Sequence, residues 1–168
     1  MIRRIVLLLA LPLLIAFGAV SPAQADSPHF IYANGALNSN GSLTVNFKEA
    51  GLGTNQLIHY VLSADATATY VCVNKGGANP SASNKTTVSG PVSATGDRSS
   101  GKNGQVTSSL TVSPPAADLG CPKGQTQQLA QVTYQNVTLT DTTNHVAIQV
   151  GTGSFSSGCL LPNVRGAC

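Results

Sequence analysis

Three histidines, His29, His59 and His145, are the only imidazole side chains that could activate a serine or cysteine as a nucleophile. Activation requires the imidazole within hydrogen-bond reach of the nucleophile and a third group that orients it. His59 lies in a strand-like run on the face opposite Ile58 and Tyr60, and His145 follows a predicted turn. The chain contains no Gly-x-Ser-x-Gly motif. The pattern predicts solvated surface histidines and no catalytic triad.

The acidic residues could support hydrolysis only if two of them faced each other across a cleft. Six follow position 25: Asp26, Glu49, Asp65, Asp97, Asp118 and Asp141. Nearly all lie in predicted turns or at loop edges, where aspartate commonly accepts hydrogen bonds from its own backbone. We therefore expect turn-capping roles rather than catalysis.

Metal and cofactor sites are not predicted either. The chain has no Cys-x-x-Cys, no His-x-x-x-His and no Asp-rich calcium loop. Gly51-Leu52-Gly53 and Gly151-Thr152-Gly153 lack the strand–helix context of phosphate-binding loops. The sequence thus predicts a protein that is not an enzyme, with no catalytic, cofactor-binding or metal-binding residues.

An aromatic platform for stacking sugars is also not expected. The chain has no tryptophan, and Tyr60, Tyr70 and Tyr134 fall in the apolar phase of predicted strands. Only Tyr32 and Phe155 remain outside that pattern.

The four cysteines are Cys72, Cys121, Cys159 and Cys168. An even number in an exported chain indicates disulfides, and four cysteines allow three pairings. We expect Cys72–Cys121, at the centre of the fold, and Cys159–Cys168, because the last two share a flexible tail and can meet at low entropic cost.

The first 25 residues have the pattern of a secretory signal peptide. A basic start at Arg3-Arg4 is followed by an apolar run from Ile5 to Val20 and by Ala23-Gln24-Ala25. The alternative is a retained membrane anchor, but the run is short for a span and contains Pro12. We therefore predict cleavage after Ala25, a secreted extracellular protein, and no membrane contact after removal of the signal.

The remaining chain has few charges and many serines, threonines, asparagines and glycines, a composition that favours strands over helices. Eight strand-like runs alternate apolar and polar residues: 29–33, 43–47, 57–63, 67–73, 86–92, 106–112, 129–139 and 145–150. Asp65 marks a predicted turn between two runs that we expect to pair, and a phase change near Gln135-Asn136 predicts a bulge or a bend. Gly90-Pro91 interrupts a run that we therefore place at a sheet edge.

These runs predict an all-β fold, an antiparallel Greek-key, immunoglobulin-like β-sandwich of about seven or eight strands. We assign residues 26–150 to this domain and 151–168 to a C-terminal tail that carries Cys159 and Cys168. The seven basic residues after the signal are scattered singly, so neither a nucleic acid nor an anionic membrane is expected as a partner.

The chain resembles a group of small secreted proteins of filamentous actinobacteria that have no assigned function. The resemblance lies in Ala68–Asn74, Leu110–Pro115, Cys121-Pro122 and Val137–Asp141, and the segment after Val150 departs from it. A more distant likeness in size, export and composition is to the actinomycete chromoprotein carriers, which implies an immunoglobulin-like sandwich that holds a small apolar ligand.

The sequence therefore predicts a secreted, non-catalytic binding or structural module for an unknown extracellular protein or small ligand. The loops Asn74–Asn84 and Gly96–Gly104 are the predicted contact surface. The alternatives are a proteinaceous inhibitor of a secreted hydrolase, which would insert one loop into its target, and a small-ligand carrier with an apolar cleft between its sheets.

Overall fold

The computed structural model describes residues 27–168, so the predicted signal peptide lies outside the described residues. The elements in chain order are β1 (His29–Leu37), β2 (Leu43–Ala50), β3 (Leu57–Asn74), the 3-10 helix η1 (Ala82–Asn84), β4 (Lys85–Ser99), β5 (Gln105–Val112), β6 (Gln125–Asp141), β7 (Val146–Gln149) and β8 (Phe155–Ser156). This range contains no α-helix and no helix long and apolar enough to cross a membrane. The all-β prediction is confirmed.

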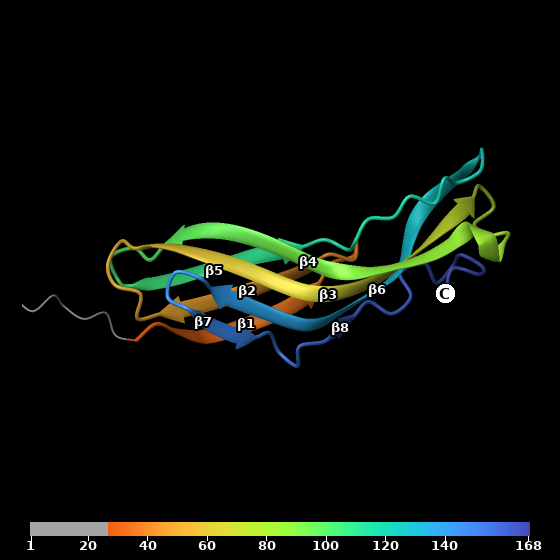
Figure 1. Ribbon diagram of the computed structural model, residues 1–168. Coiled ribbons are helices and arrows are strands. Elements are labelled where there is room, and N and C mark those ends of the chain that lie inside the picture. Colours follow the sequence, from red (N-terminus) through yellow and green to blue (C-terminus); the bar gives the residue numbers. More distant parts are fainter. Residues whose placement is uncertain (1–26) are drawn as a thin grey trace, which may run out of the picture.

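The strands form two antiparallel sheets that pack face to face (Figure 1). The smaller sheet has the order β1-β2-β5, and the larger has β4-β3-β6-β7 with β8 paired to β6. Strands β3, β4 and β6 contain 18, 15 and 17 residues, whereas β1, β2 and β5 contain 9, 8 and 8. The longer strands therefore run past the end of the sandwich (Figure 1). We call this part, residues 69–74, 85–87 and 125–131, the extension.

Strand β3 corrects the prediction of a turn at Asp65. Residues 57–74 form one continuous strand, and the two flanking runs pair with β4 and β6 rather than with each other. The alternation passes through Asp65, which is exposed between the buried Ala64 and Ala66. Because small alanines occupy the inward positions here, the hydrophobic signal is weak and the aspartate resembles a turn residue.

The predicted bulge in β6 is confirmed. Two residues, Asn136 and Val137, lie opposite the single Ala64 of β3, where the pairing shifts between Ser63 and Asp65. Asn136 adopts a positive φ of 54°, a conformation that asparagine tolerates better than most residues. Such a bulge bends its strand and redirects the neighbouring side chains.

Strand β4 lies at the edge of the larger sheet, as Gly90-Pro91 predicted. It is longer than the sequence suggested, because residues 96–99 continue the strand and pair with β3. The predicted loop Gly96–Gly104 is therefore wrong in its first half, and only residues 100–104 connect β4 to β5. The loop after Asn74 does connect β3 to β4, with η1 at its end.

The space between the two sheets is filled by side chains. Phe47, Tyr60, Leu62, Tyr134 and Leu139 are all fully buried, and each large apolar side chain stabilises the fold by about 1.5–3 kcal/mol. The rings of Phe47 and Tyr60 pack with their centroids 4.7 Å apart. The Tyr134 hydroxyl donates a hydrogen bond of 2.9 Å to the carbonyl of Gly41, in the β1–β2 turn.

A second, smaller core lies in the extension, where the last residues of the chain fold back. Ala167 is buried there against Val71, Val73 and Ala130. The backbone of Leu160 donates to Ala130 at 2.8 Å. The residues after Val150, which the sequence assigned to a tail, thus contribute β8 and this core.

Both predicted disulfides are present. Cys72–Cys121 ties β3 to the β5–β6 connection, and Cys159–Cys168 closes the end of the chain. The first bridge was expected at the centre of the sandwich, but it lies in the extension, because Cys72 is close to the end of β3.

Candidate functional site

The outer face of the larger sheet is covered by short polar side chains. Alternation along β3, β4 and β6 turns these residues away from the core, and the strand register aligns them in rows. In successive rows, the aligned residues of β4, β3 and β6 are Thr87–Thr69–Gln131, Ser89–Thr67–Thr133, Pro91–Asp65–Gln135 and Ser93–Ser63–Thr138. We call these four rows the polar face.

In two of these rows, a hydrogen bond joins the hydroxyl groups of the β3 and β4 residues. Thr67 and Ser89 are 2.8 Å apart, and Thr69 and Thr87 are 3.0 Å apart. Cross-strand pairs of this kind stabilise a sheet and hold the side chains in one orientation. The face is thus an ordered array of hydroxyl groups.

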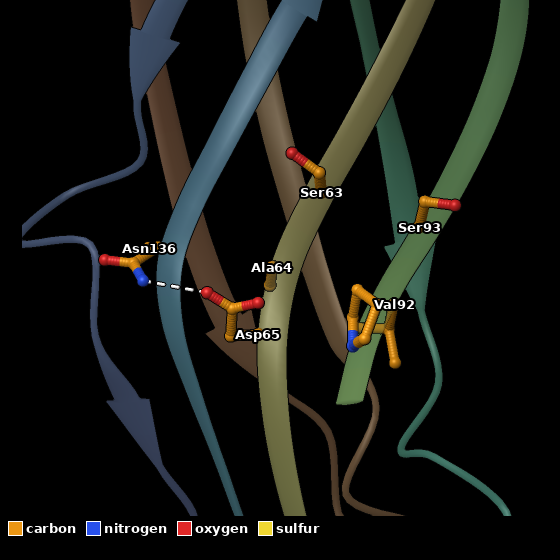
Figure 2. A pocket seen from close by; sticks show the side chains of 7 residues that line it. Ser63, Ala64, Asp65, Val92, Ser93 and Asn136 are labelled. Carbon is orange, nitrogen blue, oxygen red and sulfur yellow. Dashed lines mark hydrogen bonds between the residues drawn. The ribbon is translucent and has the colours of Figure 1, made fainter. Parts of the chain in front are cut away.

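Two shallow depressions interrupt the polar face on either side of the Asp65–Pro91 row. The first has a volume of about 300 Å³ and is lined by Ser63, Ala64, Asp65, Pro91, Val92, Ser93 and Asn136 (Figure 2). The second has a volume of about 330 Å³ and is lined by Asp65, Ala66, Thr67, Ser89, Gly90, Pro91, Thr133 and Gln135. Asp65 and Pro91 belong to both, so the depressions adjoin each other.

The local sequence explains why the face is hollowed here. Pro91 faces outward on β4 and has only a compact ring, so it fills little of the space between the neighbouring rows. On the other side of Asp65, the bulge sets Asn136 in its positive-φ conformation. Its side-chain Nδ2 donates a hydrogen bond of 2.8 Å to Asp65 Oδ2 (Figure 2).

Asp65 is the only charged residue that lines either depression. The other polar groups are hydroxyls and amides, which can both donate and accept hydrogen bonds. No lysine, arginine or histidine belongs to the two linings, so an anionic ligand would meet a carboxylate with no compensating positive charge. The site suits a ligand that is neutral or positively charged.

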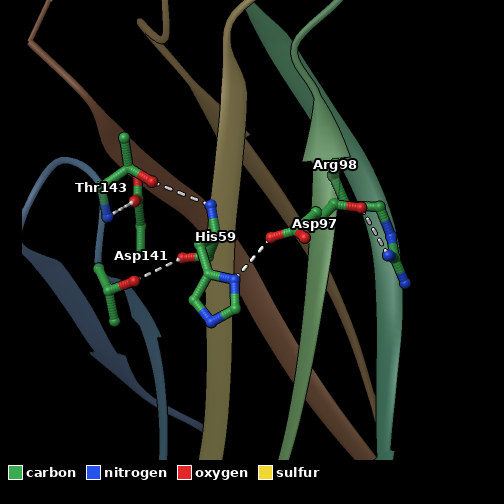
Figure 3. A network of polar contacts seen from close by, with 6 residues as sticks. His59, Asp97, Arg98, Asp141 and Thr143 are labelled. Carbon is green, nitrogen blue, oxygen red and sulfur yellow. Dashed lines mark hydrogen bonds and ion pairs between the residues drawn. The ribbon is translucent and has the colours of Figure 1, made fainter.

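His59 lies near one end of the same face, paired with Asp97 of β4 (Figure 3). His59 Nδ1 and Asp97 Oδ1 are 2.6 Å apart, and the side chains are 46% and 58% exposed. Within residues 27–168, no serine or cysteine side chain makes a hydrogen bond with His59. The remaining histidines are in other places, with His29 exposed at the start of β1 and His145 at a φ of 59° before β7.

The turn-capping role predicted for the aspartates is confirmed at two of them. Asp141 Oδ1 accepts hydrogen bonds from the backbone of Thr143 and Asn144, at 2.8 and 2.9 Å. Asp118 accepts one from the backbone of Gly120 at 3.0 Å. These carboxylates organise their own turns.

Glu49 corrects that prediction, because it lies within β2 and is fully buried between the sheets. Neither of its carboxylate oxygens nor the hydroxyl of the buried Tyr60 has a hydrogen-bond partner among the described residues. The pKa of Glu49 is raised to about 7, mainly by burial and in smaller part by the nearby charge of Asp141. The alternation of Leu43, Val45 and Phe47 places Glu49 in the inward phase, and this signal could have identified it from the sequence.

No protein-family model matches the chain, and no curated protein sequence matches it.

Proposed function

We propose that the protein is a secreted, non-catalytic binding module and that the polar face with its two depressions is its contact surface. The observation that carries this proposal is the pair of adjoining depressions, in which one exposed carboxylate is surrounded by hydroxyl and amide groups. Concave sites with a few convergent polar groups are the usual places of ligand binding. The loops Asn74–Asn84 and Gly96–Gly104 become secondary candidates, because residues 96–99 of the second belong to β4.

The scaffold suits such a role. We infer an immunoglobulin-like Greek-key topology, since the order β1-β2-β5 in one sheet and β4-β3-β6-β7 in the other requires the chain to cross between sheets after β2, after β4 and after β5. The face lies on strands instead of loops, and a site on strands is held more rigidly. Two disulfides are consistent with an extracellular location.

The proposal is tested by changing the face and a matched control position. Asp65→Arg places a long cation between the depressions, whereas Thr95→Arg places the same side chain at an exposed position of β4 outside them. Both variants and the parent protein are incubated with insoluble extracellular polymers and with secreted proteins, and the retained fraction is measured. Retention that Asp65→Arg removes and Thr95→Arg preserves supports the proposal; retention that neither variant alters contradicts it.

A second candidate, a hydrolase inhibitor, is favoured by the loop between β3 and η1. The backbone of Asn79 donates to Arg165 at 2.9 Å, and that of Ala78 donates to the Asn74 side chain at 3.0 Å. A loop held in place by hydrogen bonds at its middle could enter an active-site cleft with little entropic cost. Stoichiometric inhibition of a protease or amylase would support this candidate, and loss of the inhibition in Asn79→Pro would assign it to this loop.

The third hypothesis, an apolar-ligand carrier, finds no support in the packed space between the sheets.

A further inference from the structure

We propose that the two depressions bind consecutive residues of a neutral, linear oligosaccharide, the kind of chain found in extracellular polysaccharides. This inference rests on the proposed function, because it names the ligand class of the same face. The argument combines the hydrogen-bonding groups, the apolar surface, the repetition of the site and its charge.

The hydrogen-bonding groups of the first depression suit sugar hydroxyls. Asp65 uses Oδ2 to accept from Asn136, and the second carboxylate oxygen remains directed at the depression (Figure 2). The Ser63 and Ser93 hydroxyls stand in the adjoining row, and no hydrogen bond joins them to the other lining residues (Figure 2). A carboxylate accepts strongly from hydroxyl donors, and serine hydroxyls can donate or accept.

The floor of the site supplies the apolar surface that the carbon-bound face of a sugar ring needs. Pro91 is exposed, belongs to both depressions, and stands directly opposite Asp65 in the register. Val92 also borders the first depression, although its half-buried side chain packs against the core. The Pro91 ring can thus contact the apolar face of a sugar ring while the Asp65 carboxylate accepts a hydrogen bond from one of its hydroxyl groups. This arrangement differs from the aromatic platform that the sequence analysis considered.

The site is repeated along the strands. The depressions have similar volumes, and each is bordered by a row of hydroxyl residues, of which Ser63 and Ser93 line the first depression and Thr67, Ser89 and Thr133 line the second. Thr67 follows Ser63 by four positions on the same strand, a distance of about 13 Å. Two similar sites that adjoin each other suit a chain of repeated units better than a single small molecule.

The charge of the site favours a neutral chain over a basic peptide. Only Asp65 among the lining residues carries a charge, and the polar groups farther from it are all neutral. A lysine-rich or arginine-rich segment could form one ion pair, with Asp65, but its next basic side chain would find no second carboxylate in the linings. A neutral ligand, in contrast, can use hydroxyls and amides throughout the site. Because the depressions are shallow, we expect weak affinity, with Kd values from high micromolar to millimolar.

The test uses neutral hexasaccharides as probes: cellohexaose, maltohexaose, xylohexaose and mannohexaose, each titrated into isotopically labelled protein and followed by NMR. We expect at least one of them to shift the amide signals of residues 63–67, 89–90, 92–93 and 133–136. Asp65→Ala should weaken this binding by about tenfold or more, since a hydrogen bond to a charged group is lost. Thr95→Ala, on the neighbouring strand β4 and outside the depressions, should leave it unchanged. High salt should also leave it unchanged, since the ligand is neutral.

Other outcomes overturn the inference, and they separate it from the proposed function. If hexalysine shifts the same signals, depends on Asp65 and is released by salt, while no hexasaccharide binds, the ligand class is wrong and the proposed face stands. If a hexasaccharide binds but neither Asp65→Ala nor the double variant Ser63→Ala/Ser93→Ala weakens it, the site is wrong. If no probe shifts any signal at millimolar concentration, the saccharide inference fails. The spectrum of each variant verifies its fold, and Asp65→Asn offers a conservative replacement.

Discussion

The amide of Asn136 and the carboxylate of Asp65 are joined by a hydrogen bond of 2.8 Å, although 71 positions separate them in the sequence. The contact depends on the bulge in β6, because the positive φ of Asn136 directs its side chain towards β3. The best-defined polar pair in the candidate site is thus a product of local backbone geometry.

Replacing Asn136 should separate the two roles of this residue. Asn136→Gly keeps access to the positive φ and loses the side-chain bond, whereas Asn136→Ala loses both. A left-handed conformation costs an ordinary L-residue about 1 kcal/mol, so we expect the alanine variant to be less stable than the glycine variant by this amount. Denaturant titration of both proteins measures the difference. Equal stabilities would show that the bulge is not set by this residue.

Stability should depend on pH through Glu49. Its pKa is about 7 in the folded protein and about 4.5 in the unfolded chain, so the folded state binds the proton more tightly. The free energy of unfolding should therefore be highest below pH 4.5, fall as the pH rises to 7, and level off above that. The loss is on the order of 3 kcal/mol, at 1.36 kcal/mol for each pH unit.

Glu49→Gln removes the titrating group and keeps the shape of the side chain. The difference in unfolding free energy between this variant and the parent should grow from pH 4.5 to 7 and then stay constant, in favour of the variant. Urea denaturation at a series of pH values measures it, and subtraction cancels the titration of the other groups. A difference that is flat with pH would mean that the carboxyl group is hydrated or paired in solution.

Two buried tyrosines should respond in opposite ways to loss of the hydroxyl group. Tyr134 donates to the carbonyl of Gly41, so Tyr134→Phe leaves a buried acceptor unpaired and should cost about 1–2 kcal/mol. The Tyr60 hydroxyl has no partner among the described residues, so Tyr60→Phe should be neutral or stabilising. Thermal and chemical denaturation compare the two. A large loss in Tyr60→Phe would reveal a hydrogen bond to Glu49.

The two disulfides should differ in their contribution. Loops of 49 and 9 residues predict about 4 and about 3 kcal/mol from the entropy of the unfolded chain. Cys72→Ser/Cys121→Ser should lower the stability of the whole domain. Cys159→Ser/Cys168→Ser should instead increase hydrogen exchange near Ala167 while the exchange in β2 and β5 stays slow. Uniform loss of protection in the second variant would show that the tail and the sandwich unfold together.

The alternation in β2 and β5 and the irregularity at Gln135-Asn136 could be predicted because each is local. Leu43, Val45 and Phe47, for example, alternate with polar residues, and period-two alternation identifies a half-buried strand. The continuity of β3 could not be predicted in this way, since Ala64, Ala66 and Ala68 give little hydrophobic contrast.

The candidate site was less accessible to prediction than the fold. Asp65, Pro91 and Gln135 stand in one row only because of the register of three strands, and register is a long-range property that one sequence does not specify. Glu49 is a different case. Its inward position in β2 can be recognised from the alternation, but the acidic residues were expected in turns, so its burial was not predicted.

The described chain enters β1 at one end of the molecule and finishes in the extension at the other (Figure 1). A pull between these ends would act along β1, whose hydrogen bonds with β2 lie across the strands. These bonds would be sheared together instead of opening one after another. The last residues, closed by their own disulfide and packed against Val71, Val73 and Ala130, would transmit the force into β3 and β6. The polar face lies partly on these strands, so a pull between the ends would load the strands that carry it.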